Sequence, residues 1–207
     1  AIQDVNPQYY YDNGSVGAWF WEASAVWASG QVYPDHVYVA AFLYAYRSLP
    51  ELPVNYFKYP QQWTTDEYYQ YGSFLFVQHL TEYALSADLI RDTWVNDWSQ
   101  TVPSLDPLEV MRHILNEHEL DLDRIWMEHA AHMVYYDYEY GDNYAHMTDY
   151  QIEQSGASFV SQYFAFEELD EWIEPVSEIA PQRYGHNVIA ISDLVSGSVS
   201  IELSCDE

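Results

Sequence analysis

The chain has 207 residues, and its 33 Asp and Glu residues against 6 Lys and Arg residues give a formal net charge of −27 at pH 7. This composition excludes nucleic-acid binding and attachment to an anionic membrane surface, because both need clusters of basic side chains. Hydrophobic residues make up 49% of the sequence and aromatic residues 18%, so the chain is expected to fold around a core. No apolar run is long enough to span a bilayer, and we expect no membrane insertion.

Residues 1–135 are predicted to be helical. The stretch 15–30 is rich in Ala and Trp and ends at Gly30, which is typical of a helix C-terminus. A loop is expected from Glu51 to Trp63, because this segment contains two prolines. The helices are expected over residues 15–30, 36–47, 65–83, 87–98, 108–118 and 121–133.

The character of the sequence changes after residue 135. Residues 136–155 are aromatic and acidic and show no helical period, so we interpret them as a connector between domains. Residues 156–207 contain alternating or β-branched apolar runs between Pro and Gly residues, which is typical of strands and turns. The sequence therefore predicts an α+β fold, with a helical region (1–135), a connector (136–155) and a C-terminal β domain (156–207). The single cysteine, Cys205, excludes an internal disulfide.

Glu22 is the most unusual residue of the first predicted helix, because Trp, Phe and Ala residues surround it in the sequence. No Lys or Arg lies three or four residues away, where it would share a helix face with Glu22. A carboxylate in such surroundings is expected to be protonated, to be hydrogen-bonded to a Tyr or a backbone group, to pair with a cationic partner such as a histidine, or to bind a metal ion. All of these interpretations stay open on the sequence physics alone.

The segment around Glu22 resembles part of a family of secreted zinc metalloproteases, the gluzincin-like peptidases related to hyicolysin. The match consists of Trp19, Glu22 and Ala23-Ser24-Ala25, followed by V-Y-P-D at 32–35, and it extends to residues 71–73, 90–94 and 181–189. In this family an H-E-x-x-H helix supplies two zinc ligands and the general base, and a Glu in a W-x-x-E-x-S-A context supplies the third ligand. The resemblance implies a zincin-like helical region, a zinc ion, Glu22 as its ligand, a protein or peptide substrate, and an extracellular or cell-surface location.

The chain departs from this family at the motif that carries the activity. No H-E-x-x-H occurs in residues 1–207, although Ala1-Ile2-Gln3 resembles the residues that follow the motif, so the missing segment would lie upstream. With one ligand of three, we expect no catalytic residue and no stoichiometric zinc in this chain, which is predicted to be inactive as given.

Two functions therefore stay open. The first is a part of a secreted or cell-surface zinc endopeptidase-like protein. The alternative is a non-catalytic, acidic surface module for binding or assembly on a protease-like scaffold. In either case, the groove left by the missing segment would expose apolar surface, which favours self-association or docking of that N-terminal segment.

Other residues offer weaker hypotheses. His129 and His132 lie three residues apart, and His113 and Glu117 lie four apart on the preceding predicted helix, so these side chains could form a metal site or could simply pair with carboxylates.

The Trp residues could form a platform for sugars, but at helical spacing among Ala, Leu and Val we expect them in the core; they are Trp19, Trp21, Trp27, Trp94, Trp98 and Trp126. The acidic excess predicts adaptation to a saline medium, in which salt screens the repulsion.

Overall fold

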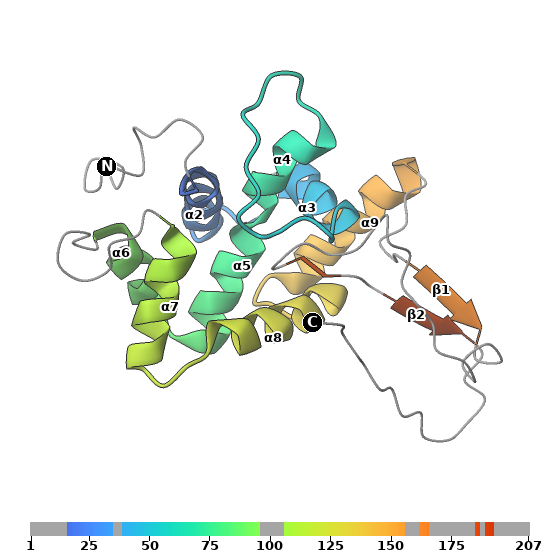
Figure 1. Cartoon of the computed structure of the whole chain (residues 1–207). Helices are drawn as coiled ribbons and strands as arrows, with labels where there is room; N and C mark the ends of the chain where they lie inside the picture. Colours follow the sequence, from blue (N-terminus) through green and yellow to red (C-terminus); the bar gives the residue numbers. More distant parts are fainter. Residues whose placement is uncertain are drawn as a thin grey trace.

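A computed structural model describes residues 16–34, 39–95, 106–155, 162–165, 185–186 and 189–192, and the structural statements below concern these residues. Helices dominate this part of the chain (Figure 1). They are α2 (Ala18–Gly30), α3 (Val39–Ser48), α4 (Thr65–Gly72), α5 (Phe74–His79), the π-helical turn η1 (Leu80–Ala84), α6 (Ala87–Val95), α7 (Pro107–Glu117), α8 (Leu122–Tyr135) and α9 (Gly141–Ser155).

The helices expected before residue 135 are confirmed where the structure describes them, and residues 51–64 form the expected loop. Their ends follow local chemistry: Asp106 caps α7, with Pro107 in the first turn, and the Asp121 side chain accepts hydrogen bonds from two N–H groups of α8. The helix predicted over residues 65–83 is instead divided into α4, α5 and η1.

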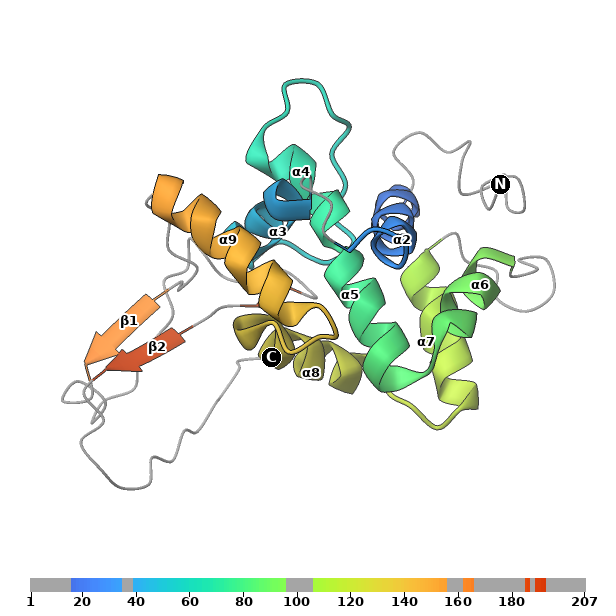
Figure 2. The same ribbon diagram turned by 180° about the vertical axis from the view of Figure 1, so that it is seen from behind.

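Helix α5 lies at the centre of the helical body, between α2 and α8 in both views (Figures 1 and 2). All six of its residues are buried. Trp19, Trp94 and Trp126 belong to the hydrophobic cluster around it, and Trp21 and Trp27 pack against that cluster. The expectation that these side chains lie in the core is thus confirmed for Trp19, Trp94 and Trp126, while Trp21 and Trp27 are partly buried at its edge. Trp98 lies outside the described residues.

The predicted α+β fold with a C-terminal β domain is wrong. The described residues are mainly helical, and the strands among them are β1 (Gln162–Ala165) and β2 (Ile189–Ser192), which pair in parallel. Short alternating runs do predict strands locally, but two strands of four residues bury too little surface to form a stable domain. The rest of the segment 156–207, including Cys205, lies outside the described residues apart from Gly185 and His186.

The prediction that residues 136–155 contain no helix is also wrong, because α9 spans Gly141–Ser155 and packs against α3. Its sequence shows little helical period, so burial of aromatic side chains stabilises it instead. The Tyr144 ring is buried and meets the Phe74 ring edge to face, with centroids 5.6 Å apart. Tertiary packing therefore overrides the weak local signal.

Gly72, the last residue of α4, lies in close contact with the backbone of α3. A Cβ atom at this position would lie 2.4 Å from the carbonyl oxygen of Phe42 and 2.5 Å from the Cβ of Tyr46. The absent side chain therefore lets the backbone of α3 contact α4 directly, which sets the position of Phe42 relative to α4.

No helix in the described ranges is long and apolar enough to cross a bilayer.

Candidate functional site

Glu22 lies in α2, where its side chain is half-buried. Burial raises the pKa of its carboxyl above the ordinary value. Helix α2 packs against α4, and Glu22 is near Tyr71 of α4: burial raises the pKa of the Tyr71 phenol, and the negative charge of Glu22 raises it further. The carboxylate thus lies at the edge of the surface formed by α4.

The basic residues that the structure describes all contact other groups. Arg47 lies over the ring of Tyr136, and the others pair with acids: Lys58 with Asp66, Arg91 with Asp88 and Asp92, Arg112 with Glu109 and Asp123, and Arg124 with Glu128. Arg183 lies outside the described residues. Within the described part of the chain, Glu22 therefore has no basic partner.

The second predicted metal site does not form among the described residues, in which no three His, Cys, Asp or Glu side chains converge as ligands. His113 pairs with Glu117 on α7 at 3.5 Å. His129 is fully buried, and its ring nitrogens hydrogen-bond to the hydroxyls of Tyr46, at 3.2 Å, and Tyr138, at 3.0 Å. A neutral imidazole donates one of these bonds and accepts the other, so both nitrogens are already engaged.

His79 is a functional candidate that the sequence analysis did not identify. Its ring is 1% exposed and packs against His129 and His132, with centroids 5.4 and 5.1 Å away. Neither ring nitrogen has a hydrogen-bond partner among the described residues. Burial, and then the proximity of His132, lower the pKa of His79 to about 4, so this imidazole is neutral at pH 7. The only available signal was its position on the buried face of the predicted helix.

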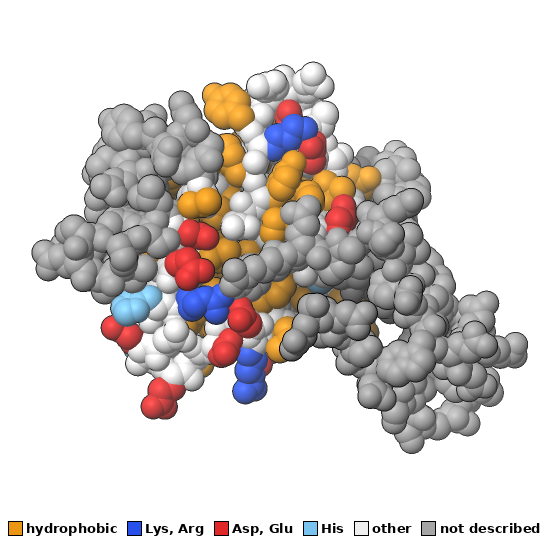
Figure 3. Space-filling view, in the orientation of Figure 1, with side chains coloured by type: hydrophobic (Ala, Val, Ile, Leu, Met, Phe, Trp, Pro, Cys, Tyr) orange, Lys and Arg blue, Asp and Glu red, His pale blue; other side chains and the backbone are white. Residues whose placement is uncertain are grey.

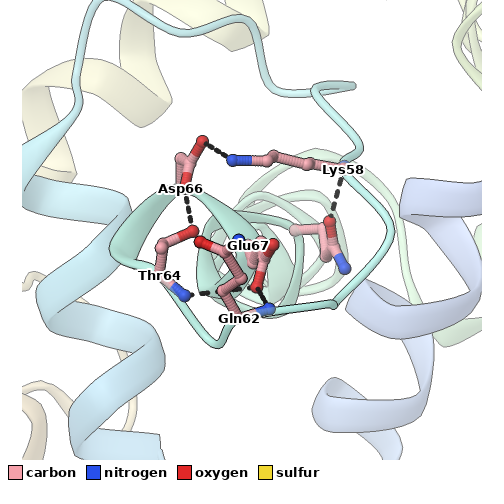
Figure 4. Close-up of polar contacts among 6 residues, drawn as sticks. Lys58, Gln62, Thr64, Asp66 and Glu67 are labelled. Carbon is pink, nitrogen blue, oxygen red and sulfur yellow. Dashed lines mark hydrogen bonds and ion pairs between the residues drawn. The ribbon is translucent and has the colours of Figure 1, made fainter.

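The loop before α4 is held in place by side chains of that helix (Figure 4). Glu67 Oε2 accepts hydrogen bonds from the backbone N–H groups of Gln62, at 3.0 Å, and Thr64, at 3.2 Å. The Lys58 N–H donates to Gln70 Oε1 at 2.9 Å, and the Lys58 ammonium pairs with Asp66. Burial alone would raise the pKa of Glu67, but hydrogen bonds from the loop backbone outweigh it and lower the pKa, so Glu67 is a carboxylate.

This loop exposes Trp63 in a left-handed backbone conformation. Trp63 has φ 57°, and its side chain is 62% exposed. It directly precedes Thr64, the N-cap of α4, and its ring lies 5.8 Å from that of Tyr68 in the first turn. Such a pair across a helix start fixes the direction in which the chain enters the helix. The indole is thus both held in place and accessible.

Trp63 continues a row of aromatic side chains, which we call the aromatic shelf: Phe42, Trp63, Tyr68 and Tyr71. Phe42 and Tyr71 stack with centroids 4.8 Å apart, and Tyr68 lies 5.9 Å from Phe42 and 6.5 Å from Tyr71. Phe42, Tyr68 and Tyr71 are each partly exposed. Seen in the orientation of Figure 1, hydrophobic side chains reach the surface of the molecule from its upper part toward the centre (Figure 3).

Comparison with known proteins gives a family but no function. The profile of a family of unknown function, DUF6055, matches residues 2–204. The chain belongs to this family. No curated protein and no solved structure matches it. The zinc-ligand role of Glu22, like the metalloprotease resemblance that suggested it, therefore stays a prediction.

We expect purified protein to contain far less than one zinc ion per chain and to leave casein intact, because Glu22 is one ligand where a catalytic zinc needs three. Metal analysis and a casein assay check this, with Glu22→Ala compared with Glu109→Ala, which removes an exposed carboxylate of α7 that is not a candidate metal ligand. Stoichiometric zinc that is lost in Glu22→Ala, but not in the control, would show that other residues complete the site.

Proposed function

We propose that this chain is a non-catalytic, acidic binding module that recognises its ligand on the aromatic shelf. The observation that carries this proposal is Trp63, whose side chain is 62% exposed on a backbone with φ 57°. A bulky residue in the left-handed region costs about 1 kcal/mol or more and persists only where its surroundings hold it, and such residues are frequent at binding sites.

The other left-handed residues besides glycine in the described chain lie at the C-terminal ends of helices, whereas Trp63 does not. Tyr136 caps the C-terminus of α8, and Glu119 follows the C-cap of α7. Left-handed residues commonly end helices in this way. Trp63 instead precedes the start of α4, and the Glu67 carboxylate holds the residues on either side of it. The strained conformation therefore serves to present the indole.

The aromatic shelf consists of residue types that are frequent in binding sites, and its exposed Trp63 is held in a fixed position. Trp and Tyr contribute most to the free energy of protein interfaces, because they bury a large area at a low cost in side-chain entropy. The hydrogen bonds of Glu67 and the ring contacts with Tyr68 fix Trp63 before a ligand arrives. Less ordering is then needed on binding, which increases affinity.

The proposal is compatible with a protease-like scaffold that carries no activity. The chain lacks the H-E-x-x-H motif, which carries the activity in the metalloprotease family, but it has Glu22, which resembles the third zinc ligand, beside the aromatic shelf. As the metalloprotease resemblance implies, we place the module outside the cell or on its surface. The high acidic charge further suggests a saline medium.

The test measures binding of two classes of probe, neutral polysaccharides and short charged peptides, to the wild type and to Trp63→Ser. We expect at least one class to bind, and Trp63→Ser to weaken this binding about tenfold, since the loss of a Trp anchor commonly costs more than 1 kcal/mol. Tyr135→Ser is the matched control, because Tyr135 is an aromatic residue that is 84% exposed on α8, away from the shelf. Equal binding by the wild type and Trp63→Ser for every probe would refute the proposal.

A further inference from the structure

Because α2, which carries Glu22, packs against α4, which carries Tyr68 and Tyr71, we infer that the ligand is a basic segment of a partner protein. An arginine side chain of this segment lies on the aromatic shelf and pairs with the Glu22 carboxylate. This inference rests on the proposed function and specifies its ligand. It depends on three features of the described residues: the arrangement of the rings, the carboxylate beside them and the charge of the whole chain.

The arrangement of the rings favours a compact cation over a chain of sugars. A flat sugar platform needs rings that lie side by side in one plane. Here Trp63 is tilted by 34° from Tyr68, and Tyr68 by 37° from Phe42 and by 54° from Tyr71, while Phe42 and Tyr71 are nearly parallel, at 21°. The negative face of one exposed ring is enough to attract a cationic head group, so such a ligand does not need several coplanar rings.

Glu22 supplies the charge that such a cation needs. The carboxylate is half-buried, its field reaches the Tyr71 phenol, and within the described residues it has no basic partner. Lys58, in the loop that carries Trp63, is already paired with Asp66. A cation from outside the chain would therefore compensate a partly desolvated negative charge, which makes the interaction stronger than on an open surface.

The charge of the whole chain narrows the identity of the partner. A net charge of −27 attracts basic partners over long distances and increases their rate of association. The same charge repels anionic ligands and a second copy of this chain, so neither is the expected occupant. A basic protein segment combines this attraction with side chains long enough to reach Glu22 across the shelf.

Arginine fits the site better than lysine does. The planar guanidinium stacks on aromatic rings and forms two parallel hydrogen bonds with a carboxylate. The lysine ammonium is a compact, strongly hydrated charge that must lose more water to lie against a ring. The site offers both an aromatic surface and a carboxylate, which is the combination that a guanidinium uses.

The experiment compares three peptides of one sequence in which the basic position is Arg, Lys or the neutral isostere citrulline. Dissociation constants are measured by calorimetry at about 0.15 M salt, where the Debye length is about 8 Å and long-range attraction is largely screened. We expect the Arg peptide to bind tightest, and both Glu22→Gln and Tyr68→Leu to weaken it about tenfold. Glu117→Gln removes the same charge from α7 and is expected to change binding less than about twofold.

The outcomes separate the inference from the proposed function. Equal binding of the Arg and citrulline peptides, equal binding of the Arg and Lys peptides, or no effect of Glu22→Gln would overturn the inference. If, in any of these cases, Trp63→Ser still weakens binding of the Arg peptide or of a neutral polysaccharide, the chain is a binding module whose ligand differs from the one inferred. If no probe depends on Trp63, both proposals fail. Unchanged circular dichroism and melting temperature of each variant would assign the losses to binding.

Discussion

Replacement of Gly72 by alanine is expected to destabilise the protein by about 2 to 3 kcal/mol, although alanine is the better helix former by about 1 kcal/mol. The added Cβ would lie 2.4 Å from the Phe42 carbonyl oxygen and 2.5 Å from the Tyr46 Cβ, so α3 and α4 would have to separate. Because the first of these atoms belongs to the backbone, no change of rotamer relieves the clash. The free energy of unfolding in urea measures the effect.

Gly30→Ala is the matched control for this prediction. Gly30 ends α2, and a Cβ there would meet no heavy atom within 4 Å. We expect a change within about 1 kcal/mol of the wild type, and in the stabilising direction, because alanine loses less backbone entropy than glycine on folding. If both variants were equally stable, the close approach of α3 and α4 would not be a constraint on the fold. Separation of these helices would also displace Phe42, so Gly72→Ala should weaken binding at the shelf.

Acid is expected to destabilise the folded state through His79. Its folded pKa of about 4 lies below the ordinary histidine value of 6.5, so the unfolded chain binds a proton in a pH range where the folded chain does not. The contribution of His79 to the free energy of unfolding is therefore fully present above about pH 6.5. It decreases as the pH falls from 6.5 to 4, and it changes little below pH 4. A difference of about 2.5 pH units corresponds to about 3 kcal/mol. His129 acts in the same direction, because burial, followed by the neighbouring histidines, lowers its pKa as well.

The variant His79→Leu isolates this contribution. Leucine keeps the site apolar and removes the group that titrates, so we expect the stability of the variant to fall less steeply between pH 6.5 and 4 than that of the wild type. Unfolding is measured in high salt, which suppresses the change in repulsion as the carboxylates are protonated. His118→Gln, at an exposed position at the end of α7, is expected to follow the wild-type profile. Parallel profiles for His79→Leu and the wild type would contradict the assignment.

The sequence predicts the helices before residue 135 well because their ends carry local chemistry. Gly30, Pro107 and Asp121 each mark a helix end through side-chain or backbone effects that do not depend on the rest of the fold. Helix α9 has no such signal and forms because aromatic side chains such as Tyr144 are buried against α5. The strand pattern after residue 156 is also local, and it cannot show how many strands pair.

The candidate site could be predicted only in part. Glu22 is visible in the sequence because an acid among Trp and Ala residues breaks a local rule. Trp63 is not, because its exposure and left-handed conformation depend on the hydrogen bonds of Glu67 to the loop backbone. His79 has only a weak signal, its place on the buried face of a predicted helix, because a histidine in an apolar run does not reveal whether its nitrogens have partners. Contacts between segments decide both cases.

The central position of α5 has a consequence for how the helical body opens. Because every residue of α5 is buried, no face of this helix can be exposed without breaking its contacts with a neighbouring helix, such as α2 or α8. The helices around α5 are therefore expected to open together with it, as one cooperative unit. Fluctuations that leave α5 in place are then confined to the periphery of the helical body.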